Sequence, residues 1–373
     1  MKITRLETIH VKPRWLFLKI HTDQDIVGVG EPTLEGRCRT VETAIREMEE
    51  YLIGQDPRQI EKHWQTLHRS PFYRTGPVLC SALSGVEQAL WDILGKSLNA
   101  PVWQLLGGKV RDRVRMYGWV AGEQTGDYIE NFKRSIHDRQ FTLYKFVPVP
   151  AMRYLESPAV IEQVVENVAQ LRAAAGPHID IGLDFHARTT PALAKVLARK
   201  LEQFDPLFLE EPVLPGDTQA LRDISNSTCI PIATGERLFT RWQFQDIIQQ
   251  QAVAIVQPDV SHAGGILEVR KIAAMAEPRN IALAPHCPLG PVALAACLQV
   301  AACTPNFLAQ EHLHLGEGYL RDPFQVDEQG YIPVSDKPGL GVELDDAAIE
   351  EKRYPGDWQN PWFTLEDGSY AEW

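Results

Sequence analysis

The sequence predicts an α/β protein: a (β/α)7β barrel of the TIM type, preceded by an α+β N-terminal capping domain. Two observations support this fold class. From about residue 113 onward, short apolar runs alternate with helical stretches, and most of these runs end in a polar or ionisable residue. Strands that alternate with helices at such spacing form parallel βαβ units, and eight strands of this kind close most simply into a barrel.

Residues 1–112 have a different pattern, which predicts the capping domain. Two strand-like runs, 3–12 and 16–32, flank a hairpin turn, and helical segments follow at 39–54 and 78–100. Strands followed by helices, without regular alternation, are typical of an α+β unit.

Residues 113–325 are expected to form the barrel. The predicted strands are 114–120, 143–149, 179–186, 206–212, 231–236, 253–260, 281–287 and 307–311. The helix predicted at 157–176 has Ser157 as its N-cap, Pro158 at its first position and Gly176 at its end. Segments 191–204 and 267–280 are also predicted helices. An open doubly wound sheet is the alternative, but it requires a glycine fingerprint of which "VGVGEPT" (27–33) has only two glycines.

The remaining segment, residues 326–373, is rich in turn-forming and aromatic residues. It includes "DKPGLGVELDD" and the final stretch "GDWQNPWFTLEDGSYAEW". We expect this segment to pack back on the capping domain.

Composition and charge exclude several classes of function. The chain has 373 residues, 44% of them hydrophobic, and a formal net charge of −12. This charge disfavours nucleic acid and anionic membranes as partners. The N-terminus lacks the pattern of a signal peptide, and the longest apolar run, 292–303, is too short to span a bilayer. The six cysteines form no CxxC pair and no zinc-binding spacing, so we expect reduced thiols and a cytoplasmic location.

Ionisable residues end six successive predicted strands, where a barrel builds its active site. Beginning with the third strand, they are Asp184 with His186, Glu210, Glu236, Asp259, His286 and Glu311. From Asp184 onward their spacings are 26, 26, 23, 27 and 25 residues. A single acidic residue at a strand end is usually a helix cap or a solvated loop residue. The regularity of the whole set indicates a functional site.

Three of these residues, Asp184, Glu210 and Glu236, predict a metal site. Carboxylates that converge on one rim repel each other unless a cation compensates. Oxygen ligands without cysteine suit Mg²⁺, whereas zinc prefers nitrogen or sulfur ligands. Glu211 follows Glu210 and should point to the opposite face of the strand, so we expect it to have a structural role.

The other residues predict acid–base chemistry beside this metal. Asp259 on the sixth strand can accept the Nδ1 proton of His286 on the seventh, which makes His286 a candidate general base. His186 is on the third strand, across the rim from the seventh. Glu311 is a candidate for hydrogen-bonding a developing negative charge if it is protonated, or for holding a substrate hydroxyl. Lys145, on the second strand, is a candidate cation for binding the substrate, with a surface lysine as the alternative.

The chain resembles the mandelate racemase subgroup of the enolase superfamily, and within it the galactonate dehydratases. The segments that carry the resemblance are "LDFHAR", "FLEEPVLP", "GERLFTRWQF", "QPDVSHAGGI", "LAPHCPLGPVALAACL", "YLIGQDP", "LNAPVWQLLGG" and the terminal "AEW". The similarity covers almost the whole chain.

The resemblance implies roles for the residues that match. Asp184, Glu210 and Glu236 match the Mg²⁺ ligands. His286 matches the base that removes the proton α to a carboxylate, and Asp259 its partner. His186 matches the acid that helps the β-hydroxyl leave, and Glu311 the residue that stabilises the enolate-like intermediate.

The chain also departs from its relatives. Many of them have Lys-x-Lys after the second strand, whereas Val147 stands in the second position here, so a lysine base on that side is absent. The following segment "VPVPAMRY" is apolar, and region 312–335 is shorter than in the galactonate dehydratases. The identity of the sugar acid is therefore left open.

The sequence thus predicts an Mg²⁺-dependent carbon–oxygen lyase that dehydrates a sugar acid, D-galactonate or a related aldonate, to a 2-keto-3-deoxy acid. Two alternatives remain: a racemase, epimerase or dehydratase of another acid sugar, and a metal-binding relative without catalysis. We expect a small acid sugar as the only ligand besides Mg²⁺, no nucleic-acid or membrane partner, and a homo-oligomer.

Overall fold

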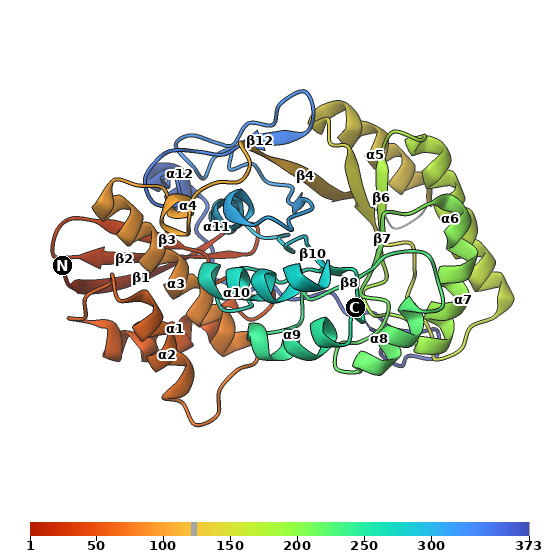
Figure 1. Ribbon diagram of the computed structural model, residues 1–373, viewed down its shortest axis with the longest axis horizontal. Helices are drawn as coiled ribbons and strands as arrows, with labels where there is room; N and C mark the ends of the chain where they lie inside the picture. The colour runs from red at the N-terminus through yellow and green to blue at the C-terminus, as the bar shows by residue number, and fades with distance from the viewer. Residues whose placement is uncertain (121–124, 373) are drawn as a thin grey trace.

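A computed structural model describes residues 1–120 and 125–372 of the chain. A small sheet with its helices, drawn in red and orange, lies at one end of the molecule, and a larger barrel surrounded by helices forms the rest (Figure 1). Within these residues, no helix combines the length and the apolar composition needed to cross a bilayer.

The N-terminal part is built on a three-stranded antiparallel sheet of order β1–β2–β3. Its strands are β1 (Ile3–Val11), β2 (Trp15–Thr22) and β3 (Val27–Gly30). Its helices are α1 (Cys38–Leu52), α2 (Ile60–Arg69), α3 (Pro77–Leu98) and α4 (Val102–Leu105). The run 16–32 forms two strands because a turn at residues 23–25 reverses the chain. Helices α2 and α4 were not predicted.

Eight parallel strands form the barrel. In chain order they are β4 (Arg113–Val120), β5 (Leu143–Phe146), β6 (Asp180–Asp184), β7 (Phe208–Glu210), β8 (Ile232–Thr234), β9 (Ile255–Val256), β10 (Ala282–Leu283) and β11 (Gln310–Glu311). Each pairs with the next, a bridge joins Leu283 to Phe307, and β11 pairs with β4. The sheet therefore closes on itself. The predicted fold class is confirmed, and the open-sheet alternative is wrong.

Seven α-helices connect these eight strands in the described residues, as the (β/α)7β pattern requires. They are α5 (Thr125–Arg139), α6 (Pro158–Ala175), α7 (Pro191–Leu201), α8 (Thr218–Ser225), α9 (Thr240–Gln249), α10 (Ile266–Ala276) and α11 (Pro291–Cys303). Short 3-10 helices follow α7 (Glu202–Phe204) and α10 (Glu277–Arg279). The Ser157 hydroxyl accepts a hydrogen bond from Val160 N at the start of α6, as its sequence predicts.

The interior of the barrel changes from apolar to polar along β5, β7, β9 and β11, which are the second, fourth, sixth and eighth barrel strands. Leu143, Phe208, Ile255 and Ala309 belong to a buried apolar cluster inside the barrel. Two residues further along the chain from each of these come Lys145, Glu210, Gln257 and Glu311. Because side chains alternate faces along a strand, these four point into the same interior. The apolar layer thus forms the floor of a polar chamber.

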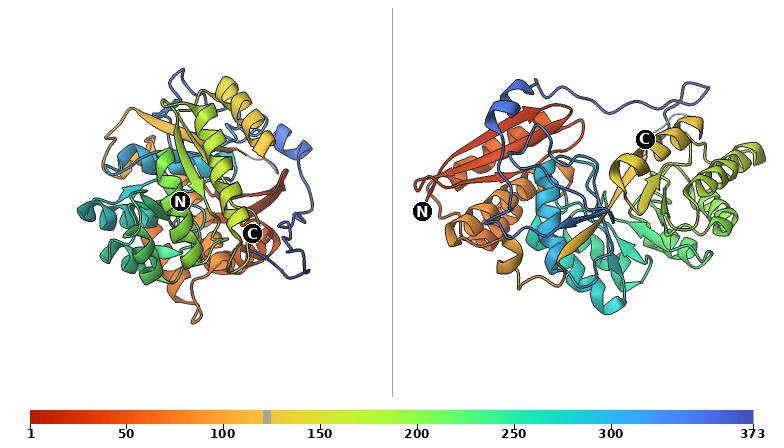
Figure 2. Two further views of the ribbon diagram at one scale, coloured as in Figure 1. Left: turned by 90° about the vertical axis from the view of Figure 1, so that its right-hand side faces the viewer. Right: turned by 90° about the horizontal axis from the view of Figure 1, so that it is seen from above.

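The C-terminal segment connects both parts of the molecule. Strand β12 (Tyr331–Pro333) pairs antiparallel with β4, and helix α12 (Asp346–Glu351) lies beside the N-terminal sheet. Beyond it, the chain runs back toward the barrel (Figure 2). There Arg188 lies 4.9 Å from the ring centroid of Phe363, and Arg153 pairs with Glu366 at 3.3 Å. The boundaries 1–112, 113–325 and 326–373 remain a prediction.

Candidate active site

Asp184, Glu210 and Glu236 converge at the carboxyl ends of neighbouring strands. Each offers one carboxylate oxygen, and these oxygens all lie within 4.8 Å of one another. Asp184 and Glu210 end β6 and β7, where the register pairs them directly, and Glu236 lies two residues beyond β8. The trio could therefore hold a metal ion through oxygen ligands alone.

Lys145 lies inside this acidic cluster. Its Nζ is 2.6 Å from Glu210, 2.8 Å from Glu311 and 3.5 Å from Asp184. The residue is only 4% exposed, so the surface-lysine alternative is wrong. An ammonium in this position offsets part of the negative charge below the mouth of the barrel.

One lysine does not neutralise the cluster. Burial raises the pKa of Glu210 well above its usual range, and the carboxylates of Asp184 and Glu311 add to this effect against the attraction of Lys145. The pKa of Asp184 is lowered, because the attraction of His186 and Lys145 outweighs the opposing effect of burial. Burial and the neighbouring carboxylates therefore disfavour the charged form of Glu210 when Lys145 is the only cation beside it, so the donor set fits a divalent ion.

His286 forms the expected pair with Asp259. Its Nδ1 lies 2.8 Å from Asp259 Oδ2, and Ser261 N donates to Asp259 Oδ1 at 2.6 Å. The other ring nitrogen, Nε2, lies 3.3 Å from Glu236 Oε2. Burial lowers the pKa of His286, but Glu236 and Asp259 outweigh it and raise the pKa to about 10. The imidazole is thus oriented by Asp259, with Nε2 directed toward the trio.

His186 follows β6 with its Nε2 3.0 Å from Asp184 Oδ2. Its backbone has a φ of 47°, and the next residue, Ala187, has a φ of 54°. This left-handed conformation is unfavourable for side chains with a Cβ, and two such residues in succession need surrounding contacts to hold them. Hydrogen bonds from His186 N to Asp184 Oδ1 and from Ala187 N to Glu211 O maintain it. The bend places the imidazole beside the candidate metal ligands.

Glu311 and Glu211 have different surroundings. Glu311 accepts a hydrogen bond from Cys287 N at 3.2 Å, which ties it to the residue after His286. Glu211 is directed away from the trio and accepts from Gly235 N at 3.1 Å and from Arg237 Nη2 at 2.7 Å. It therefore fixes the loop that carries Glu236.

Gln257 is a member of the cluster that was not predicted. Its Nε2 donates to Glu210 Oε2 at 2.7 Å, opposite the oxygen that Lys145 contacts. The alternation of Ile255, Gln257 and Asp259 along the predicted strand is a signal that could have identified it. His262 also lies close to the site, and its Nδ1 is 2.9 Å from Ser81 Oγ of α3.

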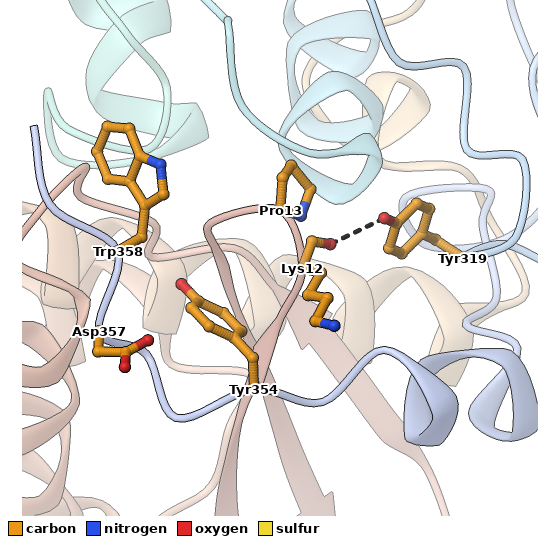
Figure 3. Close-up of a pocket in the computed structure, with 6 residues that line it drawn as sticks. All are labelled: Lys12, Pro13, Tyr319, Tyr354, Asp357 and Trp358. Atoms are coloured by element: carbon orange, nitrogen blue, oxygen red, sulfur yellow. Dashed lines mark hydrogen bonds between the residues drawn. The ribbon is translucent and has the colours of Figure 1, made fainter. Parts of the chain in front are cut away.

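A separate open pocket of about 430 Å³ lies between the turn that joins β1 to β2 and residues 319–358 of the C-terminal part of the chain. Figure 3 shows its lining residues, Lys12, Pro13, Tyr319, Tyr354, Asp357 and Trp358. None of them belongs to the acidic cluster. The candidate site is therefore the cluster at the barrel mouth.

The fold and this cluster define a (β/α)7β-barrel protein with a candidate metal site next to an aspartate-bound histidine. Residues 127–348 match the "Enolase C-terminal domain-like" family, and residues 4–107 match the N-terminal domain of the mandelate racemase / muconate lactonizing enzyme family. The chain belongs to this family of the enolase superfamily, which confirms the resemblance seen in the sequence.

Relatives and solved structures agree with this assignment. D-galactonate dehydratases from Ralstonia nicotianae and Variovorax paradoxus are 48% and 49% identical to the chain, with both chains covered completely. A structure described as an enolase, from Agrobacterium radiobacter with bound sodium and L-malate, has a TM-score of 0.92 and 31% identity over the full length of both chains. A mandelate racemase/muconate lactonizing enzyme from Jannaschia sp. has a TM-score of 0.88 and 32% identity, with 95% of this chain and 98% of the other covered.

Proposed function

We propose that the chain is an Mg²⁺-dependent dehydratase that converts D-galactonate, or a related aldonate, to a 2-keto-3-deoxy acid. The observation that carries this proposal is the carboxylate trio with the Nε2 of His286 3.3 Å from one of its members. The relatives named D-galactonate dehydratase support the choice of substrate.

Asp184, Glu210 and Glu236 would hold the Mg²⁺. Three oxygen donors and no thiolate suit this hard cation, and the neighbouring carboxylates add to the raised pKa of Glu210, as expected where negative charges converge. When bound, Mg²⁺ supplies positive charge that stabilises the carboxylate of the substrate as its α-carbon is deprotonated.

The protein's own groups move the protons. Glu236 is the largest cause of the raised pKa of His286, and its charge would be taken up by the ion it holds, which leaves Nε2 unprotonated. This Nε2 accepts the proton from C2 of the aldonate, and Asp259 stabilises the imidazolium that results. His186 donates a proton to the C3 hydroxyl, which leaves as water while the C2–C3 double bond forms. The enol then tautomerises to the 2-keto-3-deoxy acid. Lys145 lies beside Glu210 and Glu311 and supplies positive charge near the substrate, and Glu311 offers a carboxyl group to a substrate hydroxyl.

The test is an assay of purified protein with Mg²⁺ and a panel of aldonates, D-galactonate among them, with detection of the keto acid by semicarbazide. We expect His286→Asn to lower the rate of dehydration by about 10²–10⁴-fold, because it removes the general base. The matched control, His178→Asn, alters an exposed histidine and should keep the wild-type rate.

A His286→Asn variant with the wild-type rate would contradict the role of His286. Exchange of the C2 proton for deuterium without a keto acid product would favour the racemase or epimerase alternative. Mg²⁺ binding without turnover of any acid sugar would favour the catalytically silent relative.

We also propose a cytoplasmic homo-oligomer, as expected from the sequence. All six cysteines are free thiols in the structure, which suits a reducing compartment. Sedimentation velocity of the purified chain tests the oligomeric state, and fractionation of the source cells tests the location.

A further inference from the structure

A carboxylate of the N-terminal part holds the loop that follows the candidate base. Glu31 lies just after β3 and is fully buried. Its Oε1 accepts a hydrogen bond from Gly290 N at 2.6 Å, and its Oε2 accepts from Ala293 N at 2.9 Å. These amides belong to the N-terminal end of α11, four to seven residues after His286. Glu31 therefore caps a barrel helix from outside the barrel.

The contact is close enough to restrict the sequence on the barrel side. A Cβ atom at Gly290 would lie 2.6 Å from Glu31 Oε1 and 2.9 Å from the indole of Trp15. The glycine thus allows the carboxylate to approach the backbone directly. The loop of residues 286–290 is held between its strand and Glu31.

A second side chain of the N-terminal part holds the loop that carries Asp259. Gln88 of α3 is fully buried, and its Nε2 donates to Ser261 Oγ at 3.1 Å. Its Oε1 accepts from Glu31 N at 2.9 Å, so the two residues are joined to each other. Ser261 N in turn donates to Asp259 Oδ1. Gln88 therefore connects Glu31 to the carboxylate that orients His286.

These hydrogen bonds, together with the two loops, form a closed network around the Asp259–His286 pair. Glu31 fixes the loop after β10, Gln88 fixes the loop after β9, and the pair itself spans the two loops at 2.8 Å. We propose that Glu31 and Gln88 are positioning residues for proton abstraction by His286. This inference rests on the proposed function of His286 as the base.

Positioning and simple stabilisation have different consequences. A stabilising cap affects only the amount of folded protein, whereas a positioning residue affects the rate of each folded molecule. The metal ligands lie on β6, β7 and the loop after β8, which Glu31 and Gln88 do not contact in the described structure. We therefore expect a loss of kcat without a loss of Mg²⁺ affinity.

The principal variant is Glu31→Gln, which keeps the shape of the side chain but replaces one acceptor with a donor. The matched control is Asp92→Asn. Asp92 of α3 is equally buried and also accepts from two backbone amides, Val29 N at 3.0 Å and Leu340 N at 2.8 Å, and it pairs in addition with Lys96 Nζ at 2.6 Å. Neither amide belongs to the loops of the Asp259–His286 pair. Gln88→Leu is the second variant, in case Glu31→Gln does not fold.

Three measurements are made at a temperature where all variants are folded. They are the kinetics with D-galactonate, the Mg²⁺ affinity by titration calorimetry, and the NMR resonance of the Nδ1–H proton of His286. We expect Glu31→Gln and Gln88→Leu to lower kcat by about 10- to 100-fold, as a displaced catalytic group would. Mg²⁺ affinity should stay within about twofold, and the His286 resonance should shift. Asp92→Asn should keep kcat within about threefold of wild type.

The double variant Glu31→Gln/His286→Asn shows whether Glu31 acts through His286. We expect it to be no slower than His286→Asn alone, because residues that act as a unit are not additive. A Glu31→Gln variant that has a lower Tm but the wild-type kcat and His286 resonance would overturn the inference. A His286→Asn variant with the wild-type rate would instead overturn the proposed function, so the two failures are distinguishable.

Discussion

Lys145 illustrates how a single residue acquires its significance from its surroundings. In the sequence it is one charged residue at the end of a predicted strand, and a surface position was an equally simple interpretation. In the structure its ammonium lies within 3.5 Å of three carboxylates, those of Glu210, Glu311 and Asp184. The alternation of side chains explains its direction, and the closure of the barrel explains its partners.

At this scale we predict that Lys145→Met destabilises the metal-free protein by about 3–5 kcal/mol, because it leaves buried carboxylates without their cation. Mg²⁺ should restore part of this loss, since an ion at 100 times its Kd adds about 2.7 kcal/mol to the stability. Thermal unfolding with EDTA and with Mg²⁺ measures both effects. The increase in Tm on adding Mg²⁺ should be larger for the variant than for wild type.

The control for this prediction is Lys109→Met. Lys109 pairs with the exposed carboxylates of Asp112 and Asp336 at 3.4 and 3.5 Å, so its removal should cost less than about 1 kcal/mol. Equal destabilisation by both substitutions would show that Lys145 does not offset the charge of the cluster.

At the scale of elements, helix α3 connects the N-terminal part to the barrel. Its buried side chains contact the loop before α10 and the first turn of that helix. Ser84 Oγ accepts from Gly264 N of the loop, and Glu87 accepts from Ile266 N and Leu267 N of the helix. Glu87 thus caps α10 as Glu31 caps α11. Most of the 22 residues of this helix are buried, because it packs against other elements on several of its faces.

The burial of Glu87 predicts a pH dependence of stability. Burial raises the pKa of Glu87 from 4.5 to about 7, against the hydrogen bonds from Leu267 and Ile266, and the neighbouring Glu268 adds to the increase. At a pH between these two pKa values, Glu87 has lost its proton in the unfolded chain but keeps it in the folded chain. The contribution of Glu87 to the free energy of unfolding is therefore present below about pH 4.5 and lost as the pH rises to about 7.

Urea unfolding of wild type and Glu87→Gln between pH 4.5 and 8 tests this prediction. The difference in stability between wild type and variant should become less favourable to wild type as the pH rises, by on the order of 3 kcal/mol. Glu50→Gln, at an exposed position of α1, is the control and should show no such trend. A constant difference for Glu87→Gln would contradict the assigned cause.

At the scale of the whole molecule, the C-terminal segment runs from the N-terminal sheet back to the barrel (Figure 2). None of the described residues from 357 to 372 is buried. Their contacts with the barrel, such as Phe363 with Arg188, involve few side chains. This stretch therefore contributes little apolar burial to the stability of the fold.

We predict that a chain truncated after Gly356 folds cooperatively, with a Tm within about 4 °C of the full chain, because it loses only about 1–2 kcal/mol of contacts. Circular dichroism and calorimetry measure this directly. Loss of the cooperative transition would show that the last stretch belongs to the core of the fold.

The sequence by itself determined the alternation of strands and helices, the eight barrel strands and the residues at their polar ends. These features are local: they follow from the period of apolar residues and from the polar residues that end each run. The separate β2 and β3 and the helices α2 and α4 were not predicted, because short elements with mixed composition depend on packing for their stability.

Only the tertiary structure decided which of these residues meet. The burial of Lys145, the contact of Gln257 with Glu210 and the links of Glu31 and Gln88 to the Asp259–His286 loops join segments from 47 to 262 residues apart. Local sequence patterns do not predict such contacts, because these atoms come together only when the barrel closes and the N-terminal part docks on it. The chemistry of the strand ends could be predicted, and the network that orients it could not.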